Sequence, residues 1–301
     1  KEKLREALTR GVREPEKETL TVRDWLLQYT DNELAHEIFD TLGIFAIGHS
    51  YEGPASSLFA WFIKQGGERD LGIPAHGNLA EMEKLANVIK TNGDVWTNCL
   101  ATQVVVERGR AKGVVVQKAG SDIQIASSVV VSNASAKRTV DLAGIENFDE
   151  EYLRMLRLRF RPVPGSVAFV ASDRPLWPEN GEPAQLMLTG TRRLTSIIPL
   201  SNIVPELAPP GRHLLFAVGH PACTLIDLNE QEEVRQLSLD LKEQLPLFEK
   251  HGRILRIDAR QRDGEWTLGF PVGFTMPPET PVRNLYNVGE GTDPFGLNAT
   301  T

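Results

Sequence analysis

The chain has 301 residues, of which 41% are hydrophobic and 24% charged, and its formal net charge is −7. This composition is that of a globular protein long enough to bury a substantial core. The negative net charge argues against nucleic-acid binding as the main function, and no run of about eighteen apolar residues is present to predict a transmembrane helix.

The first part of the chain, to about residue 65, is expected to be mainly helical. Asp31 is the expected N-cap of a helix that ends near Gly43. A second helix is expected from Asn78, whose near capping box is completed by Glu81, to the end signal Asn92-Gly93. Its apolar residues repeat on one helical face: Leu79, Met82, Ala86 and Ile89.

After this helix the apolar residues form short runs separated by turns, which indicates a β-meander. The turns are expected at Arg108-Gly109-Arg110 and at Ala119-Gly120-Ser121-Asp122. The last run leads into Ser132-Asn133-Ala134-Ser135, a tight exit toward another helix, in which Asn133 and Ala134 are interpreted as structural turn residues. The apolar runs are 104–106, 113–116, 123–125 and 129–131.

The pattern from 146 to 275 is mixed. Strands are expected at Val167–Ala171, Ile197–Leu200 and His213–Gly219. Asn229 is expected to cap a long amphipathic helix that Pro246 bends.

The end of the chain combines a strand with a glycine turn. Leu285–Val288 is expected to be a short buried strand, and Gly289-Glu290-Gly291 allows a sharp turn. Asn298–Thr301 is typical of a helix start, and the sequence ends where that helix is expected to run. A strand, a glycine turn and a helix start are the usual parts of a nucleotide or phosphate cradle.

The cysteines and histidines predict neither a disulfide nor a metal site. Cys99 and Cys223 have no CxxC spacing, which suits a reducing, cytoplasmic compartment. The six histidines are scattered without HxxH or HExxH spacing, so no metal ligands are predicted.

Three separated segments, taken in order, resemble the phytoene-desaturase-like branch of the FAD-dependent amine-oxidase superfamily. They are Gly72-Ile-Pro-Ala-His-Gly-Asn-Leu79, Val129-Val-Val-Ser-Asn-Ala134 and Asn284-Leu-Tyr-Asn-Val-Gly-Glu-Gly-Thr292. The family reads Pro-x-Gly-Gly-Met before a helix, then Val-Val-x-Asn-Ala, and finally Asn-Leu-Tyr-x-x-Gly-Asp/Glu.

The resemblance implies a mixed α/β fold with two interleaved domains. A discontinuous FAD-binding domain would consist of residues 72–145 and 276–301. A substrate-binding domain, partly helical and partly mixed sheet, would consist of residues 1–71 and 146–275.

This sequence also departs from the family. The strand–GxGxxG–helix that seats the FAD pyrophosphate is not found, and the nearest spacing, Gly289-x-Gly291-x-x-Pro294, has proline in place of the third glycine. His76 replaces the first glycine of the family's pair, and the helix after Ala299 is missing. We therefore expect part of a longer flavoprotein: the full-length protein would bind FAD, whereas these residues alone would bind it poorly and be inactive.

The resemblance implies roles for several residues. Glu290 would accept hydrogen bonds from the ribityl or pyrophosphate region of FAD, the alternative being a solvated turn acid. The backbone of Ala101 would meet the adenine. Backbone groups of the terminal turn would approach the flavin, although ordinary loop glycines remain the alternative; these residues are Gly289, Gly291, Gly296 and Leu297.

The segment Ile44–Glu52 imitates the nucleophile elbow of α/β-hydrolases, with Ser50 as the nucleophile of a serine hydrolase. Glu52 stands where the elbow requires glycine, which argues against this hypothesis. On the flavoprotein hypothesis, His49 and Tyr51 are instead candidates for lining the substrate cavity.

The leading hypothesis is an FAD-dependent oxidoreductase that dehydrogenates or reduces a hydrophobic, isoprenoid-like substrate by hydride transfer with the flavin. This chemistry requires no protein nucleophile. The alternative is a non-catalytic ligand-binding or interaction protein derived from the same fold. The expected partner is a hydrophobic small molecule, and peripheral membrane contact stays open.

Overall fold

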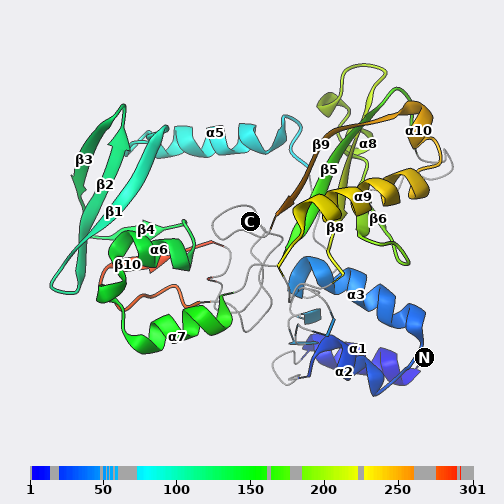
Figure 1. Cartoon of the computed structure of the whole chain (residues 1–301), viewed down its shortest axis with the longest axis horizontal. Coiled ribbons are helices and arrows are strands. Elements are labelled where there is room, and N and C mark those ends of the chain that lie inside the picture. Colours follow the sequence, from blue (N-terminus) through cyan, green and yellow to red (C-terminus); the bar gives the residue numbers. More distant parts are fainter. Residues whose placement is uncertain are drawn as a thin grey trace.

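The computed structural model describes residues 2–13, 20–47, 50, 51, 53, 55, 56, 58, 59, 73–160, 164–176, 185–222, 227–260, 276–289 and 292. Figure 1 shows two lobes, with helix α5 (Gly77–Ile89) running between them. We call the described residues within 99–160 and 276–292 the meander lobe, and the described residues within 164–260, with the helices before residue 60, the sheet lobe. The expected mixed α/β class is confirmed.

The meander lobe begins with an antiparallel sheet in the order β1-β2-β3. Arg108 and Gly109 in one turn, and Ala119 and Gly120 in the other, all have positive φ. Two successive positive φ values are typical of the two-residue hairpin turns that match strand twist, so the meander follows directly from local sequence. The prediction of these three strands is confirmed: β1 (Cys99–Glu107), β2 (Arg110–Lys118) and β3 (Ser121–Ala126).

The fourth apolar run does not extend this meander. β4 (Val130–Ser132) pairs in parallel with β10 (Leu285–Asn287), in a separate two-stranded sheet. Expecting the fourth run to belong to the meander was therefore wrong, because the distant C-terminal strand provides its partner (Figure 1).

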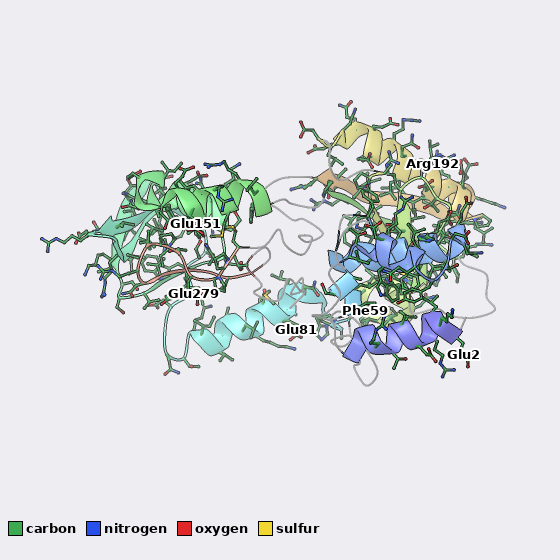
Figure 2. The ribbon with its side chains drawn as sticks, turned by 90° about the horizontal axis from the view of Figure 1, so that it is seen from below. Glu2, Phe59, Glu81, Glu151, Arg192 and Glu279 are labelled. Carbon is green, nitrogen blue, oxygen red and sulfur yellow. The ribbon has the colours of Figure 1, made fainter. Side chains whose placement is uncertain are left out.

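Helices α6 (Ala136–Ala143) and α7 (Glu150–Arg159), with the 3₁₀ turn η2 (Ile145–Asn147) between them, complete the meander lobe. Figure 2 shows Glu151 of α7 and Glu279 of the C-terminal segment in the same lobe. Helix α7 lies beyond the boundary expected at residue 145, yet it belongs to this core. The buried cluster includes Val104, Val130, Val140, Phe148, Tyr152, Met276 and Leu285.

The sheet lobe contains a five-stranded antiparallel sheet in the order β6-β7-β8-β5-β9. Helix α9 (Glu230–Gln244) packs on one face and buries Leu237 and Leu241 completely. The sheet is built from β5 (Gly165–Ser172), β6 (Leu186–Met187), β7 (Leu194–Ile198), β8 (His213–Gly219) and β9 (Gly252–Arg260), with short helices α8 (Leu200–Ile203), η3 (Pro205–Leu207) and α10 (Phe248–His251).

The expected cap of α9 is confirmed, since the Asn229 Oδ1 atom accepts a hydrogen bond from the Glu232 N–H at 3.1 Å. The expected bend at Pro246 is wrong. The helix ends at Gln244, and Pro246 lies before α10. Proline lacks an N–H and clashes with the preceding turn, and here it separates two helices instead of bending one.

Three helices form a small core of their own at the N-terminal end: α1 (Glu2–Arg13), α2 (Val22–Leu27) and α3 (Glu33–Ile47). Trp25 is its centre and lies edge-on to Phe59, with ring centroids 5.0 Å apart. Two predictions for α3 are wrong. The Asn32 side chain, and not that of Asp31, accepts from the Ala35 N–H at 3.0 Å, and the helix continues past Gly43, because one glycine costs a helix only about 1 kcal/mol.

Helix α5 is confirmed, but its expected start and its packing differ. His76 is the N-cap and makes no side-chain cap bond, so the Asn78–Glu81 capping box is wrong. None of its residues is buried. Figure 2 shows α5, marked by Glu81, as a separate helix between the two lobes. Its exposed apolar side chains are Leu79, Met82, Leu85, Val88 and Ile89. None of the described helices has the length and apolar character needed to cross a bilayer.

Candidate functional site

The carboxyl ends of β4 and β10 lie side by side, because the two strands are parallel and in register. Leu285 pairs with Val130, and Asn287 pairs with Ser132. The Val288 N–H continues the ladder by donating to the Ser132 carbonyl at 2.9 Å. Ligands of open α/β sheets bind in crevices outside the carboxyl ends of their strands. This edge is therefore the candidate site.

Gly289 approaches Asn133 at this edge. Its φ is +90°, a conformation that L side chains rarely adopt, and a Cβ atom added to it would overlap the Asn133 Oδ1 atom. Only glycine therefore fits the turn. Thr292 stabilises the turn, because its backbone N–H and its hydroxyl both donate to the Gly289 carbonyl, at 3.2 and 2.6 Å.

Helix α6 begins at the same edge, directly after β4. Ser135, with φ +74°, is its N-cap and accepts a hydrogen bond from the Arg138 N–H at 3.3 Å. The first N–H groups of a helix have no intrahelical partner and carry partial positive charge. A glycine turn beside a helix N-terminus can therefore hold an anionic group.

A buried polar layer supports the edge from below. The Thr139 hydroxyl donates to the Ser135 carbonyl at 2.7 Å and shares a second hydrogen bond with the Ser132 hydroxyl, also at 2.7 Å. Thr139 is completely buried. These bonds tie the end of β4 to the first turn of α6, so the Asn133 turn is held on both sides.

Asn287 and Tyr152 join the edge to α7. The Asn287 Nδ2 group donates to the Tyr152 hydroxyl at 2.9 Å, and both side chains are buried. Burial raises the pKa of Tyr152 to about 12, and the hydrogen bond from Asn287 opposes that shift. The Asn287 Oδ1 atom has no hydrogen-bond partner within the described part of the chain. It is a buried acceptor at the base of the candidate site.

The residues expected to bind a cofactor are only partly described. Gly289 is in the site, as above. Ala101 lies exposed on β1, opposite Val116 and next to a register shift in the meander. Four expected residues lie outside the described residues: Glu290, Gly291, Gly296 and Leu297.

Sequence reasoning treated Asn133 as a structural turn residue and missed Tyr152 and Thr139. An available signal was the polar Asn287 inside a short apolar strand, since a buried amide requires a partner. The identity of that partner could not be read from the sequence, because Tyr152 is 135 residues away.

A second concave region lies in the sheet lobe. A cavity of about 620 Å³ is bounded by one face of α3, by the turn between β6 and β7, and by residues after β8. Ser50 and Tyr51 line it, while His49 lies outside the described residues. The buried Asp240 side chain fixes the turn by accepting from the Arg193 and Leu194 N–H groups at 2.6 and 2.9 Å.

The contacts around Ser50 do not form a nucleophile elbow. Residues 33–47, which include the apolar run of the predicted elbow, form helix α3 and not a strand, so the strand–turn–helix context is lacking. The Ser50 N–H donates to Asp40 at 2.6 Å, and the His36 ring contacts the Thr30 carbonyl at 3.0 Å. Within the described ranges no group of three or more potential metal ligands is found.

Comparison with known proteins gives the fold. No protein-family model matches the sequence, and no curated protein matches it. An oxidoreductase from Methanosarcina mazei is similar over 95% of this chain and 67% of its own, with a TM-score of 0.79 and 24% identity. A protein from Pyrococcus furiosus is similar over 96% and 67%, with a TM-score of 0.72 and 20% identity.

A putrescine oxidase redesigned in its cofactor binding is similar over 90% of this chain and 62% of its own, with a TM-score of 0.61 and 15% identity. The chain thus has the fold of these three proteins. It spans about two thirds of the length of the two archaeal proteins.

Proposed function

We propose that this chain is part of an FAD-dependent oxidoreductase that dehydrogenates or reduces a hydrophobic compound by hydride transfer with the flavin. The observation that carries the proposal is the parallel pairing of β4 with β10, which brings Gly289 against Asn133 at the start of α6. Strand ends, a glycine turn and a helix N-terminus suit a phosphate-bearing cofactor. The fold shared with an oxidoreductase and a putrescine oxidase is consistent with this function.

The residues at this edge fit such a cofactor by their backbone. Ser135 caps the N–H of Arg138. The two N–H groups before it, those of Ala136 and Lys137, would donate to a phosphate. Glu290 would accept from ribityl hydroxyls, and the backbone of Ala101 would face the adenine. Bound flavin supplies the hydride chemistry, while the protein supplies position and electrostatics.

Uncovered apolar surface supports the proposal that this chain is part of a longer flavoprotein. Val131 and Tyr286 point to the face of the β4–β10 pair opposite its core and are 58% and 37% exposed. Parallel sheets almost always have both faces covered. A dinucleotide-binding unit supplied by residues beyond these 301 would cover this face.

The substrate is proposed to be hydrophobic and isoprenoid-like. Phe169 and Phe216 lie on neighbouring strands with ring centroids 5.0 Å apart. Side chains alternate along a strand, so these rings lie on the sheet face opposite the one that Ala168 buries under α9. An aromatic face suits an extended apolar molecule. Tyr51, which lines the cavity of about 620 Å³, and His49 are also proposed to contact the substrate.

The test measures FAD retained by the protein expressed from its complete reading frame, after desalting, from visible flavin absorbance. We expect about one FAD per chain, a large loss in Gly289→Ala, and no loss in Gly93→Ala, because a Cβ at Gly93 makes only ordinary contacts. A complete protein that retains no FAD, and gains none on titration, contradicts the proposal.

The 301 residues alone are the second arm. We expect them to bind FAD weakly, since no GxGxxG fingerprint is present among them. Tight stoichiometric binding by this chain would leave the FAD proposal standing and overturn the need for further residues.

A further inference from the structure

A cavity of about 520 Å³ lies at the end of the five-stranded sheet beside α10, in the sheet lobe. Figure 1 shows α10 on the side of that lobe turned away from the meander lobe. Here β5 ends at Ser172, between the first residues of β8 and β9, because Ser172 pairs with both His213 and Gly252. The cavity is therefore distinct from the proposed cofactor edge.

Two arginines that form no ion pair with any described residue line this cavity, namely Arg212 and Arg253, each of which is exposed. Within the described residues, most other arginines of the sheet lobe do form ion pairs. The paired ones are Arg174, Arg192, Arg193, Arg235, Arg256 and Arg260. Unneutralised positive charge in a chain of net charge −7 indicates an anionic ligand.

The strand register lets both guanidinium groups reach one ligand. Arg253 pairs with Ala171, and Ala171 pairs with Leu214 on its other side. Neighbouring strands are about 4.8 Å apart, so the Cα atoms of residues flanking β5 are about 10 Å apart. Arg212 precedes β8 at this end. Two long arginine side chains can converge on one anion across that distance.

Polar groups on the wall favour an oxyanion. His213 and His251 also line the cavity. The His251 Nδ1 atom is 2.9 Å from the Asp173 Oδ1 atom, so Nε2 is the ring nitrogen not engaged in that contact. Asp173 is the acidic residue of the lining, and Arg174 lies 3.9 Å from the same oxygen. The Asp173 carboxylate thus interacts with His251 and Arg174, and not with Arg212 or Arg253.

Ser172 adds a buried hydroxyl at the end of β5. The residue is 4% exposed, and its Oγ atom has no hydrogen-bond partner among the described residues. Buried polar side chains usually have a partner, so this hydroxyl requires one. Side chains alternate along a strand, so Ser172 lies on the face of β5 opposite Ala171, the partner of Arg253, and its hydroxyl is not a proposed contact of the phosphate.

The remaining walls are apolar, which points to an amphiphilic ligand. Leu255 is 49% exposed at the rim, although it is a large hydrophobic residue. Other apolar lining residues come from η3, the loop that follows it and the start of β8: Leu207, Ala208, Pro209 and Leu214. An inorganic anion would leave this surface in water, whereas an attached apolar chain would cover it.

We propose that this cavity binds a phosphate monoester carrying an apolar chain, with the phosphate between Arg212 and Arg253 and the chain against Pro209 and Leu255. A phosphate monoester carries about −1.5 to −2 charges at neutral pH and three strong acceptors, which matches two arginines better than a carboxylate does. The same chemistry is offered by a free alkyl phosphate and by the head group of phosphatidic acid in a membrane. This site does not depend on the flavin function.

The test is calorimetric titration of the protein with octyl phosphate, inorganic phosphate and octanol. We expect octyl phosphate to bind more tightly than either of the other two. The double variant Arg212→Gln/Arg253→Gln should weaken its binding by at least roughly tenfold, as expected for lost charge-assisted hydrogen bonds. Arg256→Gln is the matched control, since Arg256 lies on the same strand, pairs with Asp258 and is absent from the cavity lining.

The outcomes separate the two sources and the competing explanations. Arginine-dependent sedimentation with vesicles that contain phosphatidic acid assigns the ligand to a membrane, while octyl phosphate binding without sedimentation assigns it to a free compound. Both support the site. Equal affinity for octanol, equal affinity for inorganic phosphate, unchanged octyl phosphate affinity in the double variant, or no binding at all overturns it. Unchanged melting temperatures of the variants show that the fold is intact.

Discussion

The five-stranded sheet and the β4–β10 pair differ in how completely they are covered. In the sheet lobe, β5 buries Ala168 and Val170 under α9, so the chain supplies both the sheet and its helix layer. In the meander lobe, Leu285 is buried, whereas Tyr286 beside it on β10 stays exposed. The open face of the β4–β10 pair and helix α5, which has no buried residue, share one property: both expose apolar side chains. Apolar surface without a cover marks where more protein or a partner is expected.

The largest effect is expected on stability, when one leucine is replaced in covered helix α9 and one in uncovered helix α5. Leu241→Ala on α9 should lower the free energy of unfolding of the sheet lobe by about 2–5 kcal/mol, because Leu241 is completely buried. Leu85→Ala on α5 should change stability by less than about 0.5 kcal/mol, because Leu85 is 55% exposed. Urea unfolding of both variants measures the contrast.

The same pair sharpens the proposal about further residues. In the protein expressed from its complete reading frame, a covered α5 should make Leu85→Ala cost at least about 2 kcal/mol. An equally small effect in both forms would show that α5 remains uncovered.

A smaller effect is expected at the turn of the parallel pair. Gly289→Ala should destabilise the meander lobe by about 1–3 kcal/mol, because φ is +90° and the new Cβ meets Asn133. Adding Asn133→Ala should recover part of that loss by removing the overlap while leaving the backbone strain. Thermal unfolding of the single and double variants measures both terms, and a double variant no more stable than Gly289→Ala would argue against the Asn133 contact.

The smallest expected effect is a pH dependence at Tyr152. Its pKa is raised from 10.0 to about 12 in the folded protein, so the unfolded chain releases this proton first. The stabilisation is therefore complete below pH 10 and is lost as pH rises toward 12, by at most about 1.4 kcal/mol per pH unit. Urea unfolding at about pH 9 and about pH 11 measures the slope.

Tyr152→Phe is the control for that slope. It removes the titrating group and should flatten this contribution above pH 10. It should also cost about 1–3 kcal/mol at neutral pH, because the Asn287 amide would lose its acceptor in a buried place. An alkaline slope that survives in Tyr152→Phe would have to come from other groups.

Local signals predicted much of the secondary structure. The turns at Gly109 and Gly120 predicted the meander, and Asn229 predicted the start of α9. Both predictions succeeded because turn and cap geometry depends on a few adjacent residues. Local signals failed where two answers were nearly equal. Asn32 replaced Asp31 as a cap, and the apolar run after Gly43 continued α3 as helix.

The sequence predicted only one part of the candidate site, the glycine turn at the end of β10. The glycine turn after Val288 was recognised from its residues, and its glycine is required by the observed φ and by the close Asn133 side chain. That Asn133 would be this neighbour, and that Tyr152 would hold Asn287, depends on contacts between distant parts of the chain. Neither strand by itself indicates which distant strand will pair with it, as β4 does with β10.

The amino-acid sequence by itself determined the hairpins of the meander, the capped helix α9 and the need for a glycine at position 289, since each depends on backbone conformation over a few neighbouring residues. Only the tertiary structure decided that β4 leaves the meander to pair with β10, that α5 buries nothing, and that Arg212 and Arg253 flank one cavity. The physical reason is that burial and charge neutralisation are properties of a neighbourhood assembled from distant segments. The residues that make up such a neighbourhood are chosen by packing and not by their order along the chain.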